Sequence, residues 1–206
     1  MKSLGARGPE PGVRQERHRI FIAVELDPAL REAVGEIEHR LEKAGAHAKW
    51  VKPASLHFTL RFIGEIPAAQ VARVKIAVRE AMVGIQPFDI VLQSLGAFPS
   101  LRRPQVVWVG VTEGAGELEA VAARINDHLA RHRFPPPDRE FRPHLTLARV
   151  RGAHAWGDLV RALDQFRDAG MGRQRVEAIS VMESELMAHG PLYTRIEEVR
   201  LSPHEK

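Results

Sequence analysis

Cysteine is absent from the 206-residue chain. Its absence excludes disulfide scaffolds, thiolate zinc sites, iron–sulfur clusters and a cysteine nucleophile. No apolar run approaches the roughly 20 residues that a transmembrane helix needs. The first 17 residues also lack the apolar stretch of a secretory signal, so we expect a cytoplasmic protein. Walker A, GxSxG and complete GxGxxG patterns are missing, which argues against built-in ATP use, a serine hydrolase and a dinucleotide site.

The composition is that of an ordinary globular protein. Hydrophobic residues make up 44% of the chain and charged residues 27%, enough to bury a core. Lys and Arg number 30 against 26 Asp and Glu, a net charge of +4. This mild excess is compatible with an anionic ligand, although charge alone favours a solvated arginine-rich surface.

Hydrophobic periodicity predicts alternating strands and helices. Asp27 is expected to cap the first helix, and Gly45 to end it. Residues 1–17 and 201–206 are expected to be tails around a single bilobal domain at 18–200. Strands are expected at 19–26, 55–63, 88–95, 106–111, 143–150, 175–182 and 193–199, and helices beginning near 28, 67, 117 and 154.

A shift of 87 residues places five of these elements on one another. The strand at 19–24 falls on 106–111, and the tetrapeptide HFTL at 57–60 falls on HLTL at 144–147. This register indicates duplication. We therefore expect an α+β fold with pseudo-repeats at about 19–105 and 106–200, each forming one lobe.

The repeated tetrapeptide is the strongest signal in the chain. Composition alone predicts about 0.02 His-x-Thr-Leu sequences, and two are present. In a strand, residues i and i+2 point to the same face, so the polar residues are expected to face a cleft and the apolar residues the core. The polar set is His57, Thr59, His144 and Thr146, and the apolar set is Phe58, Leu60, Leu145 and Leu147.

Two imidazoles in one cleft suit acid–base catalysis. With a reference pKa of about 6.5, one ring can accept a proton while the other donates one. Threonine hydroxyls can donate hydrogen bonds to phosphate oxygens between them. A lone His-x-Thr is usually an ordinary polar face, but a matched pair favours phosphodiester cleavage without a metal.

With these motifs the chain resembles the two-histidine (2H) phosphoesterases, specifically the bacterial RNA 2′,3′-cyclic phosphodiesterases, also called 2′-5′ RNA ligases. The resemblance runs from about Arg19 to Val199 and rests mainly on HFTLRFIG at 57–64 and RPHLTL at 142–147. It implies a bilobal fold in which two antiparallel sheets with flanking helices enclose a central cleft carrying both motifs.

The resemblance also implies a reaction. A terminal 2′,3′-cyclic phosphate of RNA would be hydrolysed to a 2′-phosphate, with His57 as proton donor to the leaving 3′ oxygen and His144 as acceptor from water. No cofactor and no obligate protein partner are expected, and the partners are RNA ends or nucleotides that carry a cyclic phosphate. Reversal, joining ends through a 2′-5′ linkage, is left open.

Three further side chains are candidates for substrate binding. Arg61 and Arg142 each share a strand face with a motif histidine, so either guanidinium is suited to bind phosphate. The alternative is an ion pair with Glu183 or Glu185. Tyr193 is the sole tyrosine, and it is expected either to stack on a base or ribose or to be a buried aromatic.

Other functions remain open. A 2H esterase could act on a cyclic nucleotide, a 2′-5′ oligonucleotide or ADP-ribose cyclic phosphate. A non-catalytic module could use the histidines only to hold an RNA end. His128 and His132 have the i, i+4 spacing of a metal pair, but no third ligand is apparent, so we expect an exposed helix end and no metal site.

Overall fold

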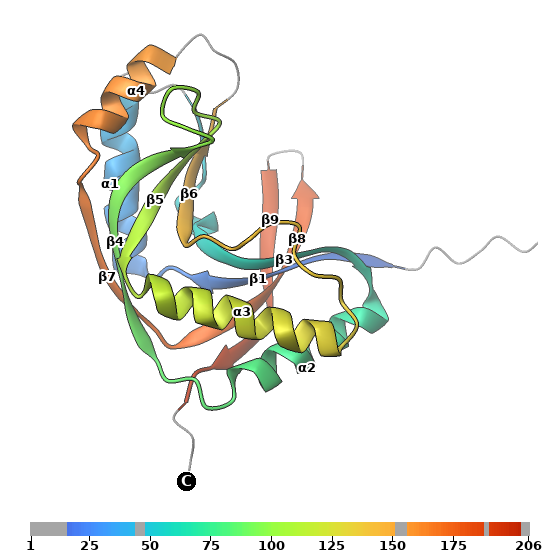
Figure 1. The fold of residues 1–206 in the computed structure, drawn as a ribbon. Coiled ribbons are helices and arrows are strands. Elements are labelled where there is room, and N and C mark those ends of the chain that lie inside the picture. The colour runs from blue at the N-terminus through green and yellow to red at the C-terminus, as the bar shows by residue number, and fades with distance from the viewer. Residues whose placement is uncertain (1–15, 44–47, 151–155, 188–189, 203–206) are drawn as a thin grey trace, which may run out of the picture.

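The computed structural model describes residues 16–43, 48–150, 156–187 and 190–202. Two sheets and four helices make up this part of the chain (Figure 1). The strands are β1 (Arg17–Glu25), β2 (Lys49–Trp50), β3 (His57–Pro67), β4 (Phe88–Phe98), β5 (Val106–Glu113), β6 (His144–Arg149), β7 (Gly170–Val176), β8 (Ala178–Met187) and β9 (Gly190–Arg200). The helices are α1 (Pro28–Lys43), α2 (Ala68–Met82), α3 (Ala115–Arg131) and α4 (Trp156–Gln165), with a short 3-10 turn at Pro53–Ser55.

Both sheets are antiparallel throughout. One has the order β3-β1-β8-β9, and the other the order β2-β6-β5-β4-β7. Helices α2 and α3 pack on each other and against the four-stranded sheet, whereas α1 and α4 lie against the five-stranded sheet (Figure 1). The predicted α+β class with two antiparallel sheets is confirmed. None of the described helices is long and apolar enough to cross a membrane.

The expectation that each half of the chain forms one lobe is wrong. Strands β1 and β3 from the first half share a sheet with β8 and β9 from the second, while β4 joins β5 and β6 in the other sheet. Two helices also pack on the sheet that does not contain the strand before them. Helix α1 follows β1 but packs on β7, and α3 follows β5 but packs beside β3. The sequence repeat therefore describes the order of elements but not which strands pair.

The strand predicted at 175–182 is two strands. β7 ends at Val176 and pairs with β4, whereas β8 begins at Ala178 and pairs with β1 in the other sheet. Glu177 between them is where the chain passes from one sheet to the other. The break between them is a single residue, so the sequence pattern predicted the two segments as one strand.

The chain ends differ slightly from the predicted tails. Arg17 belongs to β1 and pairs with Pro67, and Leu201 is buried, its backbone N–H donating to the Glu177 carbonyl at 2.8 Å. Residues 1–15 and 203–206 lie outside the described residues. Arg17 and Leu201 therefore belong to the folded part of the chain and not to the predicted tails.

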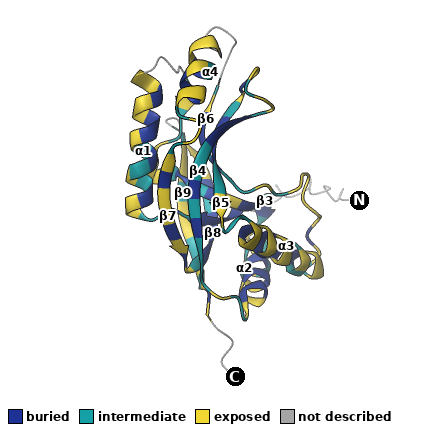
Figure 2. Cartoon of the chain, turned by 60° about the vertical axis from the view of Figure 1, so that its left-hand side comes forward, coloured by how far each residue is buried: buried dark blue, intermediate teal, exposed yellow. Residues whose placement is uncertain are grey.

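Local chemistry explains where α1 begins. The backbone N–H of Leu30 donates to Asp27 Oδ1 at 2.7 Å, as predicted for the cap residue, and Pro28 occupies the first turn. The predicted apolar stripe is buried, and Figure 2 shows α1 with one buried and one exposed side. Its members are Leu30, Val34, Ile37 and Leu41. Gly45, the predicted end of the helix, lies outside the described residues.

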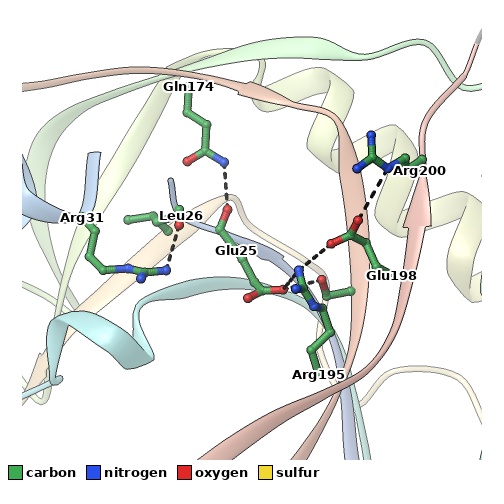
Figure 3. A network of polar contacts seen from close by, with 8 residues as sticks. Glu25, Leu26, Arg31, Gln174, Arg195, Glu198 and Arg200 are labelled. Carbon is green, nitrogen blue, oxygen red and sulfur yellow. Dashed lines mark hydrogen bonds and ion pairs between the residues drawn. The ribbon is translucent and has the colours of Figure 1, made fainter. Parts of the chain in front are cut away.

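A buried glutamine ties the two sheets together. Gln174, on β7, donates its side-chain N–H to the Glu25 carbonyl at 2.8 Å (Figure 3). Its side-chain oxygen also accepts the Asp27 backbone N–H at 2.9 Å. Glu25 ends β1 in the four-stranded sheet, so the two bonds span the junction between the sheets. The position of one cleft wall relative to the other depends on this junction.

Candidate active site

A cleft of about 870 Å³ lies between the two sheets. β1, β3, β8 and β9 supply one wall, and β2 and β6 supply the other. All four polar motif residues line it, and the four apolar motif residues between them are buried. The structure thus brings the two His-x-Thr strands to one opening, as the sequence predicts.

The two motif histidines are held in the same way. The His57 Nδ1–H donates to the Ser55 carbonyl at 2.8 Å, and the His144 Nδ1–H donates to the Arg142 carbonyl at 2.6 Å. Ser55 and Arg142 are themselves 87 residues apart. A neutral imidazole that donates through Nδ1 keeps its lone pair on Nε2. Each ring therefore has Nε2 available for proton transfer in the cleft.

Aromatic rings fix the orientation of both imidazoles. The His57 ring lies 4.8 Å from the Phe21 ring and 5.1 Å from the Tyr193 ring, centroid to centroid, the latter edge to face. His144 meets Phe98 edge to face at 5.1 Å. Tyr193 is half-buried and lines the cleft, so it is not the buried aromatic of the second alternative, and its stacking on a base or ribose stays a prediction. Burial raises the pKa of its hydroxyl, which therefore stays protonated near neutral pH.

Burial also affects the protonation of His57. Desolvation lowers the pKa of the His57 imidazole below its usual value, while the bond to the Ser55 carbonyl and the carboxylate of Glu25 oppose this shift. Neutral His57 is accordingly favoured in the free protein. A bound phosphate would act in the opposite sense, because a nearby negative charge stabilises the imidazolium.

Arg61 does not share the face of His57, contrary to the sequence expectation. In the ladder, Ala23 pairs with Thr59 and Ile22 with Arg61, so Leu60 is the extra residue of a β-bulge. The bulge reverses the alternation, and the Arg61 side chain is buried, donating to the Pro135 carbonyl at 2.6 Å. Desolvation lowers the pKa of its guanidinium.

The same bulge occurs 87 residues later. Trp108 pairs with Thr146 and Val107 with Ala148, which leaves Leu147 as the extra residue. Phe62 and Arg149 consequently take the cleft-facing places that simple alternation assigns to 61 and 148. At equivalent positions one half of the repeat thus presents an aromatic ring and the other a guanidinium.

Sequence reasoning missed the cations of the cleft. Arg19, Lys49, Lys52 and Arg149 line it, whereas none of its described lining residues is Asp or Glu. Lys49 lies directly opposite Arg149 across the β2–β6 ladder, and like charges in such a pair repel. The arrangement is typical of an anion-binding site. The sequence alone held no signal for Arg149, because the bulge that turns it toward the cleft is visible only in the pairing of β6 with β5.

Arg142 and Glu183 also differ from expectation. The Arg142 side chain is exposed and is not among the described residues that line the cleft, although its carbonyl positions His144. Glu183 Oε1 lies 2.6 Å from His18 Nδ1, within hydrogen-bond distance, so the partner of Glu183 is a histidine rather than Arg61 or Arg142.

His128 and His132 lie between α2 and α3. Glu80 Oε2, on α2, is 2.9 Å from His132 Nε2 and 3.5 Å from His128 Nδ1, and the bond to His132 lowers the pKa of the Glu80 carboxyl. His128 is largely buried, so the expectation of an exposed helix end is wrong for it. No group of three or more potential ligands within the described residues could hold a metal ion.

Comparison with known proteins identifies relatives along almost the whole chain. The model of the LigT-like phosphoesterase family matches twice in succession, at residues 23–108 and 109–193. An RNA 2′,3′-cyclic phosphodiesterase of Methanothermobacter thermautotrophicus is 36% identical over 183 residues, covering 89% of this chain and 98% of that protein. One of Aeropyrum pernix is 38% identical over 167 residues, covering 81% and 94%.

Solved structures agree with the sequence relatives. A crystal structure of a Thermus thermophilus protein superposes with a TM-score of 0.74 at 26% identity, covering 91% of this chain and all of that one. The two consecutive matches of the family model correspond to the internal repeat. The chain belongs to the family of LigT-like 2H phosphoesterases.

Proposed function

We propose that this phosphoesterase hydrolyses the 2′,3′-cyclic phosphate at the end of an RNA to a 2′-phosphate, using His57 and His144 as its acid and base. The observation that carries the proposal is the matched pair of imidazoles on one cleft, each bonded through Nδ1 to a carbonyl two residues earlier. Relatives named RNA 2′,3′-cyclic phosphodiesterase support the substrate.

The reaction needs one neutral and one protonated ring. Neutral His144 removes a proton from water through Nε2 as the water oxygen forms its bond to phosphorus. The bond from phosphorus to the 3′ oxygen then breaks, and the Nε2 proton of His57 passes to that oxygen. The product carries a 2′-phosphate and a 3′-hydroxyl. The same sequence, with an RNA 5′-hydroxyl in place of water as the nucleophile, would join two ends through a 2′-5′ linkage and leave a free 3′-hydroxyl.

The remaining polar groups stabilise the phosphoryl charge. Thr59 and Thr146 line the cleft beside the two rings and are placed to donate to the non-bridging oxygens. Lys49 and Arg149 contribute positive charge on the side of the five-stranded sheet. Proton transfer rather than metal ligation fits this donor set, since both Nδ1 atoms are already bonded and the described lining has no carboxylate.

End-group analysis tests the proposal. An oligoribonucleotide ending in a 2′,3′-cyclic phosphate should be converted to the 2′-phosphate product alone, at the same rate with and without a chelator. A 3′-phosphate product would contradict the assigned bond cleavage. Binding without product at any pH would identify a module that only holds RNA ends.

A parallel assay decides between substrate classes. A 2′,3′-cyclic mononucleotide, a 2′-5′ oligonucleotide and ADP-ribose cyclic phosphate would be offered at equal concentration. Faster turnover of any of these than of the RNA would assign the enzyme to another branch of 2H esterases. A cytoplasmic location and the lack of an obligate protein partner stay predictions.

A further inference from the structure

A series of aromatic rings leads across the five-stranded sheet to His144. Strands β4, β5 and β6 are neighbours in this sheet (Figure 1). Phe98 on β4 and Trp108 on β5 have ring centroids 5.3 Å apart. The Phe98 ring in turn meets the His144 ring on β6 at 5.1 Å, with an interplanar angle of 89°. The aromatic stack, Trp108 with Phe98, therefore ends on the imidazole of the second motif.

Trp108 lies in the middle of this wall of the cleft. The strand ladders place it opposite Gly96 on one side and opposite Thr146 on the other. Directly opposite residues in an antiparallel ladder project to the same side of the sheet. The indole therefore emerges on the side that carries Thr146, which lines the cleft.

The indole lies over two residues that have no side chain. A Cβ atom on Gly96 would lie 2.2 Å from Trp108 Cζ2 and 2.3 Å from Cη2, and one on Gly110 would lie 3.4 Å from Cζ3. Gly110 faces His144 across the β5–β6 ladder. A methyl group at position 96 cannot be accommodated unless the indole moves, and a moved indole changes what Phe98 packs against. Gly96 is thus required for the observed place of the ring.

Neither ring of the aromatic stack belongs to the cleft surface. Phe98 and Trp108 are not among the described residues that line the cleft. Phe21 and Tyr193, the rings that flank the other motif histidine, both belong to that lining. The aromatic stack therefore affects the reaction through His144 and not by touching the substrate.

Stability does not explain why an indole occupies this position. Trp108 Nε1 is buried and has no hydrogen-bond partner in the part of the chain that the structure describes. A buried donor without an acceptor destabilises a fold, because its bond to water is lost and not replaced. A ring made only of carbon would avoid that loss. What the indole supplies is extent, since its six-membered ring reaches over both Gly96 and Gly110.

The orientation of His144 decides which nitrogen faces the cleft. Its Nδ1–H donates to the Arg142 carbonyl, which leaves Nε2 for the proton of water. Rotation of the imidazole about its Cβ–Cγ bond would break this hydrogen bond and move Nε2. The Phe98 ring, packed edge to face on the imidazole, opposes that rotation. We infer, resting on the proposed function, that Phe98 and Trp108 are positioning residues for the proton acceptor His144, and that Gly96 provides the space that the indole needs.

Two variants and their combination test this inference kinetically. Phe98→Leu keeps an apolar side chain but loses the ring, and Gly96→Ala displaces the indole. On an RNA with a 2′,3′-cyclic phosphate, each should lower kcat by about tenfold and change KM by less than about twofold, because the base is misplaced while substrate contacts remain. Since Trp108 acts through Phe98, the double variant should be within about twofold of Phe98→Leu.

Nitrogen NMR of the histidine rings gives a readout that does not depend on turnover. At a pH where both imidazoles are neutral, wild-type His144 should be protonated at Nδ1, as its bond to the Arg142 carbonyl requires. Phe98→Leu and Gly96→Ala should each show a second population of His144 protonated at Nε2. His57, on the other sheet, should stay protonated at Nδ1 in both variants.

Phe166→Leu is the matched control. Phe166 follows α4, packs against the hydrophobic core and lies outside the described lining of the cleft. The variant makes the same change of side chain as Phe98→Leu. It should lower the thermal stability but leave kcat and the tautomers of both motif histidines unchanged.

The possible outcomes separate this inference from the proposed function. An unchanged kcat or an unchanged His144 tautomer in Phe98→Leu would refute the positioning role, whether or not Gly96→Ala folds. An equal loss of kcat in Phe166→Leu would assign the effect to stability and refute it as well. A loss of about 100-fold in the double variant would refute the route through Phe98. If the wild type converts no cyclic phosphate, the proposed function fails, and the tautomer measurement still decides whether the aromatic stack holds the imidazole.

Discussion

Glu25 lies directly opposite His57 in the antiparallel pairing of β1 with β3. Its carboxylate is held in place, since the Ser180 hydroxyl donates to Oε1 at 2.6 Å and Arg195 lies 3.4 Å from the same atom (Figure 3). The negative charge opposes the effect of burial on the His57 pKa. Glu25 is thus a positioning residue for the charge state of the proposed acid.

The first prediction concerns that charge state. Histidine-selective NMR titration should show His57 titrating below its ordinary value of about 6.5, because burial is the largest influence on its pKa. Glu25→Gln should lower the pKa further, since the opposing charge is removed. Inorganic phosphate should raise it by adding negative charge to the cleft.

Glu198→Gln serves as the control for Glu25→Gln. Glu198 pairs with Arg195 on the far side of the same network (Figure 3), and it is not among the groups that shift the His57 pKa. This variant should leave the titration of His57 unchanged. A higher His57 pKa in Glu25→Gln would contradict the assigned direction.

The second prediction concerns the motif residues themselves. His57→Ala or His144→Ala should reduce kcat by at least about 100-fold, the usual contribution of a general acid or base. Thr59→Val and Thr146→Val should reduce the rate while the protein stays folded, because valine is nearly isosteric with threonine. Single-turnover rates and thermal unfolding measure the two effects separately. Wild-type turnover in both histidine variants would disprove the proposed mechanism.

The third prediction contrasts two arginines. Arg149→Gln should raise KM by about tenfold and weaken the salt dependence of binding, because a charge in the cleft is lost. Arg61→Gln should leave KM unchanged but reduce the free energy of unfolding by about 1–3 kcal/mol, because the buried bond to the Pro135 carbonyl is lost. Equal effects of both variants on KM would contradict the bulge-based assignment.

The sequence was sufficient to predict the motif strands and the helix stripes. Alternation over a few residues is a local property, so His57 and Thr59 were assigned correctly to one face. The shared cleft could also be anticipated, because an internal repeat places equivalent segments in equivalent positions. Both predictions depended on patterns within one element or on exact repetition.

The incorrect predictions were those that depended on which strands pair and in what register. A bulge is visible only against the partner strand, so alternation assigned the cleft to Arg61 rather than to Phe62. Similarly, nothing in the apolar pattern reveals that β4 joins the sheet of β5 and β6 while β8 joins the sheet of β1 and β3. Lys49 and Arg149 come from different parts of the chain, and only the β2–β6 ladder shows that they are neighbours.

The last prediction concerns stability rather than catalysis. Glu38, on α1, is buried, its Oε1 has no hydrogen-bond partner, and burial together with the nearby Glu42 raises its pKa from 4.5 to about 8. The folded protein thus binds a proton that the unfolded chain releases above about pH 4.5. The stability associated with protonated Glu38 is complete below that pH and is lost as the pH rises toward 8.

Glu38→Gln removes this titration while keeping the shape of the side chain. Its free energy of unfolding should exceed that of the wild type by about 2–4 kcal/mol at pH 8 and by less than about 1 kcal/mol at pH 5. Glu36→Gln, on the exposed side of the same helix, is the control and should follow the wild type at both values. Urea unfolding at the two pH values measures the difference. Because the effect comes from the ionisation of one buried carboxyl, a gain in stability that is the same at pH 5 and pH 8 would show that the substitution acts through packing instead.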